Sequence, residues 1–226
     1  MSRAAAFGSA EEPSRGAGDP EEQPTIADRP EEWETVEGSE PFRGAKTSLR
    51  LDRVRMPGID GSEVVSREYM EHPGAVAAVA LDGDGRVLLL SQYRHPVRHR
   101  MWELPAGIRD EAGEPPVRTA QRELLEEAGY RADHWHELVG FFPSTGFSSE
   151  RIQVYLARGL TKVPDAEVGF HRVHEEADME LVWLPLEDAL TAVMADRIHN
   201  AATVIGVLSA SIAARDGFAT LTPAAV

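Results

Sequence analysis

Three glutamates crowd one short stretch of this sequence. Glu123, Glu126 and Glu127 follow a double proline in the segment GIRDEAGEPPVRTAQRELLEEAGY, residues 107–130. Like charges at such spacings destabilise an isolated helix, so the cluster requires either open solvent or a compensating cation. Carboxylate oxygens are the ligands that Mg²⁺ and similar hard cations prefer. Two interpretations follow, a solvated acidic face or one part of a metal site.

The helix that would carry these glutamates has clear limits in the sequence. Pro116 suits a first helical position, Gly129 suits the left-handed residue past a helix end, and helical periodicity runs between them to Ala128. At 100° per residue the glutamates occupy an arc of about 100°. A separate stripe contains the apolar residues Val117, Ala120, Leu124 and Ala128. One face should therefore pack on the core while the adjacent face concentrates negative charge.

The plain alternative is an ion-paired surface. Arg118 and Arg122 lie on the same helix and are close enough in sequence to pair with the glutamates. Most Glu-rich helices are solvated in this way. The triad by itself therefore does not decide between a surface helix and a metal site.

A wider pattern surrounds the triad. Gly107, six residues, Glu114, seven residues and then RELLEEAGY, ending at Tyr130, closely resemble the Nudix box, the signature of Nudix hydrolases. The usual form is G-x5-E-x7-R-E-U-x-E-E-x-G-U, with U an aliphatic or bulky apolar residue. Here the first gap is one residue longer and the last position is a tyrosine. The extra residue falls in the loop RDEAGE, where added length costs little.

The resemblance covers residues 45–212 and is to the ADP-ribose pyrophosphatase branch of the family. It implies an α+β fold, an α/β/α sandwich with a mixed sheet, preceded by a small antiparallel sheet. The implied activity is Mg²⁺-dependent hydrolysis of the pyrophosphate bond of ADP-ribose to AMP and ribose 5-phosphate. Two alternatives are another nucleoside diphosphate sugar as substrate, or a non-catalytic ADP-ribose-binding sensor. The intact glutamate triad argues against the sensor.

The same resemblance implies a ligand set. Glu123 and Glu127 would be the principal ligands of Mg²⁺, or of Mn²⁺ in its place, and the backbone carbonyl of Ala106 would complete the inner shell. Glu126 would join them or act through a bound water, and so is also a candidate catalytic residue. The supporting positions are Gly107, Glu114 and Arg122, the last two as an ion pair that anchors the loop to the helix.

Pyrophosphate hydrolysis also needs a general base and groups that bind phosphate. The resemblance places the base on a loop well after the box, where VHEEADME supplies Glu175 and Glu176. Two solvated loop glutamates are the alternative there. By the same resemblance, the candidate substrate-binding residues are Arg67, Arg94 and Glu103.

The chain divides by composition. Residues 1–38 are rich in Glu, Pro, Gly and Ser, which is typical of disorder. Residues 39–72 contain two alternating segments around the turn PGIDG and predict a β subdomain. Residues 73–215 would form the hydrolase domain, and 216–226 a C-terminal tail.

Within the hydrolase domain, strand and helix patterns alternate, which indicates a mixed sheet with helices. We expect strands at 75–82, 86–94 and 101–107, within 135–142 and 150–160, and from 180, with helices at 116–128, from 187 and at 200–214.

Composition also limits the partners. The 226 residues carry a net charge of -15, which argues against nucleic acid because phosphate contacts need clustered Lys and Arg. No apolar run approaches the roughly 20 residues that span a bilayer, so we expect no membrane insertion. The chain has no cysteine, which fits a cytoplasmic protein. A homodimer with an exchanged N-terminal sheet is implied by the resemblance alone.

Overall fold

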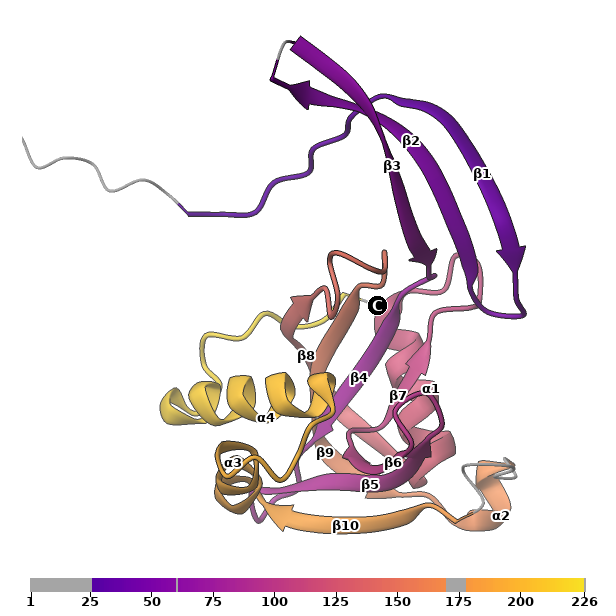
Figure 1. Cartoon of the computed structure of the whole chain (residues 1–226). Coiled ribbons are helices and arrows are strands. Elements are labelled where there is room, and N and C mark those ends of the chain that lie inside the picture. The colour runs from indigo at the N-terminus through magenta and orange to yellow at the C-terminus, as the bar shows by residue number, and fades with distance from the viewer. Residues whose placement is uncertain (1–25, 60, 170–177, 226) are drawn as a thin grey trace, which may run out of the picture. The chain divides into compact units, whose positions relative to one another are not determined.

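We obtained the fold from a computed structural model of the chain, which describes residues 26–59, 61–169 and 178–225 (Figure 1). The chain separates into two compact units, Met1–Trp33 and Glu34–Val226. The described residues of the first unit form neither helix nor strand. All elements described below belong to the second unit.

The order of elements follows the predicted alternation closely. The strands are β1 (Thr35–Arg43), β2 (Ser48–Gly58), β3 (Gly61–Glu71), β4 (Ala75–Ala80), β5 (Arg86–Arg94), β6 (His99–Glu103), β7 (Ala106–Ile108), β8 (Tyr130–Phe141), β9 (Ile152–Lys162) and β10 (Glu180–Pro185). The helices are α1 (Pro116–Ala128), α2 (Asp165–Val168), α3 (Leu186–Met194), α4 (Ala201–Ala213) and the short 3-10 helix η2 (Ala214–Asp216). Among the described residues, no helix has the length and apolar character needed to cross a bilayer.

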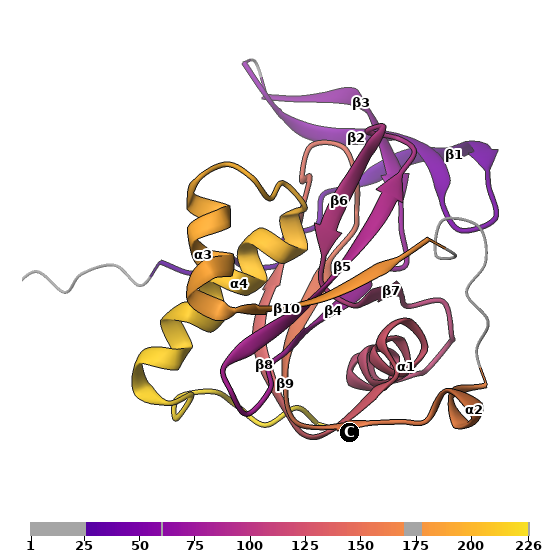
Figure 2. The same ribbon diagram turned by 90° about the horizontal axis from the view of Figure 1, so that it is seen from below.

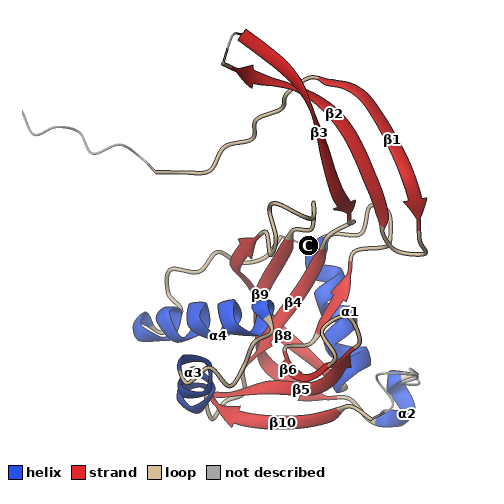
Figure 3. Ribbon diagram, viewed as in Figure 1, coloured by secondary structure: helices blue, strands red, loops and turns tan. Residues whose placement is uncertain are grey.

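An antiparallel sheet of order β1-β2-β3 opens the second unit. Its hairpin pairs Ser48 with Glu71 at one end and Gly58 with Gly61 at the turn, where the sequence predicted it. In Figure 3 no helix of the described chain covers either face of this sheet. The sheet joins the following domain partly through Met70, whose N–H donates to the Phe147 carbonyl (2.8 Å).

The first strand lies partly inside the segment that composition predicted to be disordered. β1 begins at Thr35, before the expected limit at residue 38. Acidic residues at its start meet arginines of β2: Arg55 donates to Glu34, which immediately precedes the strand (2.8 Å), and Arg53 lies 3.4 Å from Glu37 of β1. Opposite charges on neighbouring strands favour pairing. A prediction from composition treats these glutamates as solvated, because it takes no account of partners on another strand.

The remaining residues form three layers, as expected (Figure 2). A mixed sheet of order β7-β4-β9-β8, in which β4 and β9 are parallel, lies beside an antiparallel sheet of order β10-β5-β6. Helix α1 covers one side of these sheets, and α3 and α4 cover the other. This arrangement confirms the α+β class and the predicted mixed sheet with helices.

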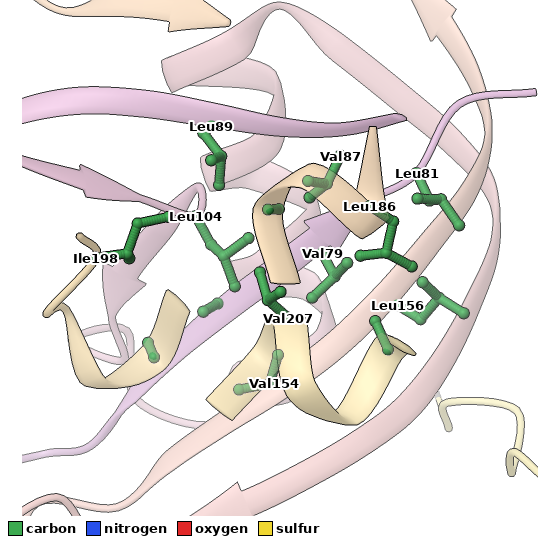
Figure 4. Packing of buried hydrophobic residues seen from close by; sticks show 14 of the residues in the cluster. Val79, Leu81, Val87, Leu89, Leu104, Val154, Leu156, Leu186, Ile198 and Val207 are labelled. Atoms are coloured by element: carbon green, nitrogen blue, oxygen red, sulfur yellow. The ribbon is translucent and has the colours of Figure 1, made fainter. Parts of the chain in front are cut away.

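Two apolar clusters hold the layers together. The cluster beneath α3 and α4 includes Val79, Leu104 and Val154 (Figure 4). Gly206 of α4 brings that helix close to the sheet, since a Cβ there would lie 2.7 Å from Leu104 Cδ1. Beneath α1, the predicted apolar stripe packs on the opposite side of the sheets and includes Leu124, which is fully buried. Each fully buried Leu or Val contributes roughly 1.5–3 kcal/mol.

The C-terminal residues pack on the domain, whereas the sequence suggested a tail from 216. Phe218 and Leu221 pack against the larger apolar cluster. Thr222 accepts a hydrogen bond from the Glu137 N–H (2.9 Å), and the Ala224 N–H donates to the Trp135 carbonyl (2.9 Å). Strand β8 is the edge of its sheet and has unpaired backbone groups to satisfy. The C-terminal segment supplies partners for them.

Candidate active site

Helix α1 is placed by its two ends. Pro116 occupies the first turn, and Gly129 ends the helix with φ of 69°, a left-handed conformation that suits glycine. The Gly129 N–H donates to the Leu125 carbonyl (2.8 Å). Lys162 of β9 donates to the Ala128 carbonyl (3.0 Å), which puts a positive charge at the negative end of the helix dipole. The bounds of α1 agree with the sequence prediction.

Glu127 is more deeply buried than the helical projection suggested. The projection placed all three glutamates on an arc separate from the apolar stripe, but Glu127 is only 6% exposed. Its Oε2 accepts a hydrogen bond from the Ala106 N–H of β7 (2.8 Å). A buried carboxylate requires such compensation. Glu127 thus lies at the boundary between the core and the acidic face.

Gly107 brings a second carboxylate to the same short strand. A Cβ at this position would lie 2.0 Å from Glu123 Oε1 and 2.5 Å from Glu123 Cγ. The Glu123 side chain therefore fills the space that any larger residue at 107 would need. Glu123 and Glu127 both reach β7 at Ala106 and Gly107, and this is the central juxtaposition of the site.

Arg122 connects the carboxylates of the box. Its Nη1 lies 2.8 Å from Glu123 Oε1 and 3.3 Å from Glu126 Oε2, and its Nη2 lies 3.9 Å from Glu114 Oε2. Burial lowers the pKa of Arg122, but the three surrounding carboxylates raise it further, so it lies above its ordinary value. Glu114 also accepts a hydrogen bond from Thr119 Oγ1 (2.7 Å). Arg122 thus makes both the pair with Glu114 that the resemblance implied and pairs with two glutamates of the triad.

The residues present suit a divalent cation, although they are not assembled around one. Among the described residues, no three Asp, Glu or His side chains stand together as ready metal ligands. Glu123 and Glu126 instead share the guanidinium of Arg122. This sharing shows that the carboxylates converge on one positive charge. An all-oxygen donor set of this kind is the type that Mg²⁺ and Mn²⁺ take.

Two of the candidate substrate-binding residues bind each other. Arg94 ends β5 and Glu103 ends β6, and Arg94 donates to Glu103 through Nε (3.0 and 3.1 Å) and Nη2 (2.6 Å). Glu103 is 2% exposed, whereas the Arg94 side chain is 44% exposed. The buried carboxylate thus fixes an arginine that still faces outward.

A pocket of about 430 Å³ adjoins these residues. Arg94, Glu103, Ala106 and Gly107 all line it, so it reaches the strand on which Glu123 and Glu127 converge. Its volume falls in the range of about 300–1,000 Å³ that is usual for small-molecule sites. The structure therefore joins the acidic helix to a hollow large enough for a nucleotide.

The other predicted residues are not brought to this pocket within the described chain. Arg67 is exposed on β3 and donates to the Ser66 carbonyl (2.9 Å) and Met56 Sδ (3.2 Å), both in the N-terminal sheet. Glu175 and Glu176 lie outside the described residues.

Sequence reasoning missed His72 and Glu150. They line the pocket and lie 3.7 Å apart, His72 Nδ1 to Glu150 Oε1. No local pattern marks either residue. The backbone contact of Met70 with Ser148 places their two segments side by side. Only the pairing of distant segments could have identified them.

The three-layer fold, the box helix and the glycine on β7 define a class of protein, and the chain belongs to the Nudix family. The NUDIX domain family matches residues 71–203. The chain is 45% identical over 188 residues to the ADP-ribose pyrophosphatase of Mycobacterium tuberculosis, covering 83% of this chain and 87% of that protein. It is 36% identical over 176 residues to the methanol dehydrogenase activator of Bacillus methanolicus, covering 78% and 91%.

A third relative supports this assignment, and a solved structure has the same fold. The ADP-ribose pyrophosphatase of Bacillus subtilis is 33% identical over 176 residues, covering 78% of this chain and 91% of that protein. A crystal structure described as an ADP compounds hydrolase superimposes with a TM-score of 0.65 at 17% identity, covering 84% of this chain and 99% of that one. At this identity the superposition supports the fold alone.

Proposed function

We propose that the protein is an ADP-ribose pyrophosphatase, an enzyme that hydrolyses ADP-ribose to AMP and ribose 5-phosphate. The observation that carries the proposal is the convergence of Glu123 and Glu127 on Ala106 and Gly107, beside the nucleotide-sized pocket. The similarity to the enzymes of M. tuberculosis and B. subtilis supports ADP-ribose as the substrate.

Mg²⁺ is the proposed cofactor, with Glu123, Glu126 and Glu127 as its side-chain ligands and the Ala106 carbonyl beside them. When bound, such an ion neutralises phosphate charge and lowers the pKa of a coordinated water. The chain's own contribution is to orient these oxygens. The Ala106 N–H holds Glu127, and the missing side chain at Gly107 admits Glu123.

Arg94 is the proposed ligand of the diphosphate. A guanidinium matches phosphate oxygens with paired donors. Glu103 holds Arg94 by hydrogen bonds to Nε and Nη2, and so acts as a positioning residue. The proposed general base is either Glu175 or Glu176, and Glu126 is the third candidate.

A homodimer is the proposed assembly, in the cytoplasm. Within the described chain no helix covers the N-terminal sheet, and its exposed side chains include the apolar Val36 and Phe42; exposed apolar surface favours association. Arg67 would then act from the sheet of a second copy. Light scattering should give twice the mass of one chain, and a monomer would contradict the proposal.

Mixed dimers test the role of Arg67 directly. Combining Arg67→Gln chains with Glu127→Gln chains should restore activity, because one of the two shared sites then has both residues intact. No recovery from two separately inactive variants would show that Arg67 does not act across the dimer.

A substrate panel tests the activity. Purified protein with Mg²⁺ is incubated with ADP-ribose, nucleoside diphosphate sugars and diadenosine polyphosphates, and products are separated by chromatography. AMP should appear fastest from ADP-ribose. Faster turnover of another compound would replace the substrate, and no turnover of any would favour a sensor that only binds ADP-ribose.

A further inference from the structure

A second, smaller pocket adjoins the one that Arg94 and Glu103 line. It has a volume of about 310 Å³ and lies between β6 and the loop that joins α3 to α4. It shares Val97 and Met101 with the larger pocket, so the two hollows are neighbours. Its polar lining consists of His99, Arg100, Arg197 and His199.

The charge of this pocket is opposite to that of the whole chain. The protein carries a net charge of -15, yet no acidic residue occurs between Asp84 and Glu103, a stretch that includes the turn RHPVRHR. Within the described residues, Arg197 makes no ion pair and no side-chain hydrogen bond. Of the nearby acidic residues, Asp196 lies 3.2 Å from His199 Nε2, and Asp178 accepts from Arg100 through its backbone carbonyl. The guanidinium of Arg197 is thus available to an anion.

Two further side chains of the pocket, Arg100 and His99, are held by hydrogen bonds to backbone carbonyls. Arg100 uses Nη1 for the carbonyls of Ser91 (3.5 Å) and Asp178 (3.3 Å). His99 Nδ1 lies 2.6 Å from the Val97 carbonyl, which requires Nδ1 to donate. These contacts limit the positions that the two side chains adopt at the pocket wall.

The walls of the pocket are anchored in the core. Ile198 is buried, and Trp102 packs against the larger apolar cluster. The Leu104 N–H donates to Thr203 Oγ1 (3.1 Å), which ties the end of β6 to α4. Asn200 caps the same helix by accepting from the Thr203 N–H (3.0 Å). The basic side chains therefore extend from a fixed frame, which lowers the ordering cost of binding.

We propose that this basic pocket binds a phosphate monoester on the part of the substrate distal to the nucleoside. The inference rests on the proposed function and extends it: ADP-ribose remains a substrate, and an ADP-ribose that carries a further phosphate on its distal ribose gains contacts with this pocket. A phosphate monoester offers three acceptor oxygens to the guanidinium and imidazole donors. The shared residues Val97 and Met101 allow one ligand to extend from the larger pocket into the smaller one.

Binding is tested without catalysis. Inorganic phosphate is titrated into ¹⁵N-labelled protein without Mg²⁺, at constant ionic strength set by chloride. Backbone amide signals of residues 97–102 and 197–200 should shift and saturate. In an Arg197→Gln, His199→Gln double variant the affinity should fall by about tenfold or more, the loss expected when charge-assisted contacts are removed.

Arg215→Gln is the matched control, because Arg215 is exposed on η2, outside the pocket. It removes the same charge as Arg197→Gln and should leave the phosphate affinity unchanged. Absent shifts, or equal affinity in the wild-type and double-variant proteins, would overturn the pocket assignment.

Substrate choice is tested separately. The value of kcat/KM is measured for ADP-ribose and for ADP-ribose phosphorylated on its distal ribose, and the second value is divided by the first. The wild-type protein should favour the phosphorylated compound by about tenfold, and the double variant should lose this preference. Phosphate binding with an unchanged ratio would mean an adventitious ion only and would reject the subsite. If neither compound is hydrolysed, the proposed function fails, while the titration still decides the pocket.

Discussion

At the residue scale, the absence of a side chain at Gly107 leaves the space that the Glu123 side chain occupies. A Cβ in Gly107→Ala would be 2.0 Å from Glu123 Oε1, so the carboxylate would have to leave β7. The side chain can rotate, so folding should be retained. Hydrolysis of ADP-ribose should fall by about 100-fold, because small misplacements of catalytic groups have effects of that size. Steady-state kinetics and thermal unfolding measure the two effects.

Gly83→Ala is the matched control for this change, because a Cβ at Gly83 meets nothing within 4 Å. It should leave kcat/KM near the wild-type value. If Gly107→Ala does the same, Glu123 does not act from its position against β7.

Glu127 allows a second test, because its charge and its hydrogen bond are separable. In Glu127→Gln the amide oxygen can still accept from the Ala106 N–H, so the protein should fold normally. Loss of the charge should reduce turnover by about 100-fold or more, since metal-ion catalysis supplies several kcal/mol and each 1.36 kcal/mol is tenfold.

Calorimetric titration with Mn²⁺ should show weaker binding by the Glu127→Gln variant. Glu111→Gln, at an exposed glutamate of the preceding loop, should change neither turnover nor binding. Wild-type metal affinity in Glu127→Gln would remove Glu127 from the ligand set.

At the element scale, the end of α1 depends on Gly129 and on a lysine from another strand. A Cβ at Gly129 would lie 2.6 Å from Lys162 Nζ, and the residue has a positive φ of 69°. Gly129→Ala should therefore cost about 1–2 kcal/mol in backbone strain alone, with a further loss from displacing Lys162. This corresponds to a Tm lower by roughly 2–8 °C in a chain of this size.

Gly113→Ala provides the comparison, because Gly113 also has a positive φ, 82°, but nothing lies within 4 Å of its Cβ. Calorimetry should give a smaller loss of Tm for this variant than for Gly129→Ala. Equal losses would mean that the contact of Lys162 with the helix end adds nothing.

At the scale of the whole molecule, the C-terminal segment returns along β8 and pairs with it at His136, which is partly buried. Burial, the charge of Arg158 and that of His134 lower the pKa of His136. Its Nδ1 is buried and has no hydrogen-bond partner among the described residues. The unfolded chain therefore binds a proton more readily than the folded chain as pH falls below about 6.5.

Stability from this residue is fully present above that pH and is lost as pH falls toward the lowered pKa of the folded state. Urea unfolding between pH 7.5 and 5.5 should show a loss of the free energy of unfolding. His136→Gln should show a smaller loss over the same range. Identical slopes would mean that His136 is not responsible.

Local sequence patterns were sufficient to predict the elements that hold the candidate site residues. The proline and glycine at its ends and the apolar stripe defined α1, because caps and periodicity act within a few residues. Continuous apolar runs likewise marked β4 and β5. By contrast, the first four residues of β1 were assigned to the tail, because the partners of this segment lie on β2, including its backbone ladder and the arginines Arg53 and Arg55.

The sequence by itself determined the box, its helix and the class of layered fold. Only the tertiary structure decided that Glu127 is buried against Ala106, that Glu123 occupies the space at Gly107, and that Arg94 and Glu103 bind each other. Each of these contacts joins two different elements. Their geometry depends on how sheets and helices pack across long sequence separations, and residue type and spacing do not specify that packing.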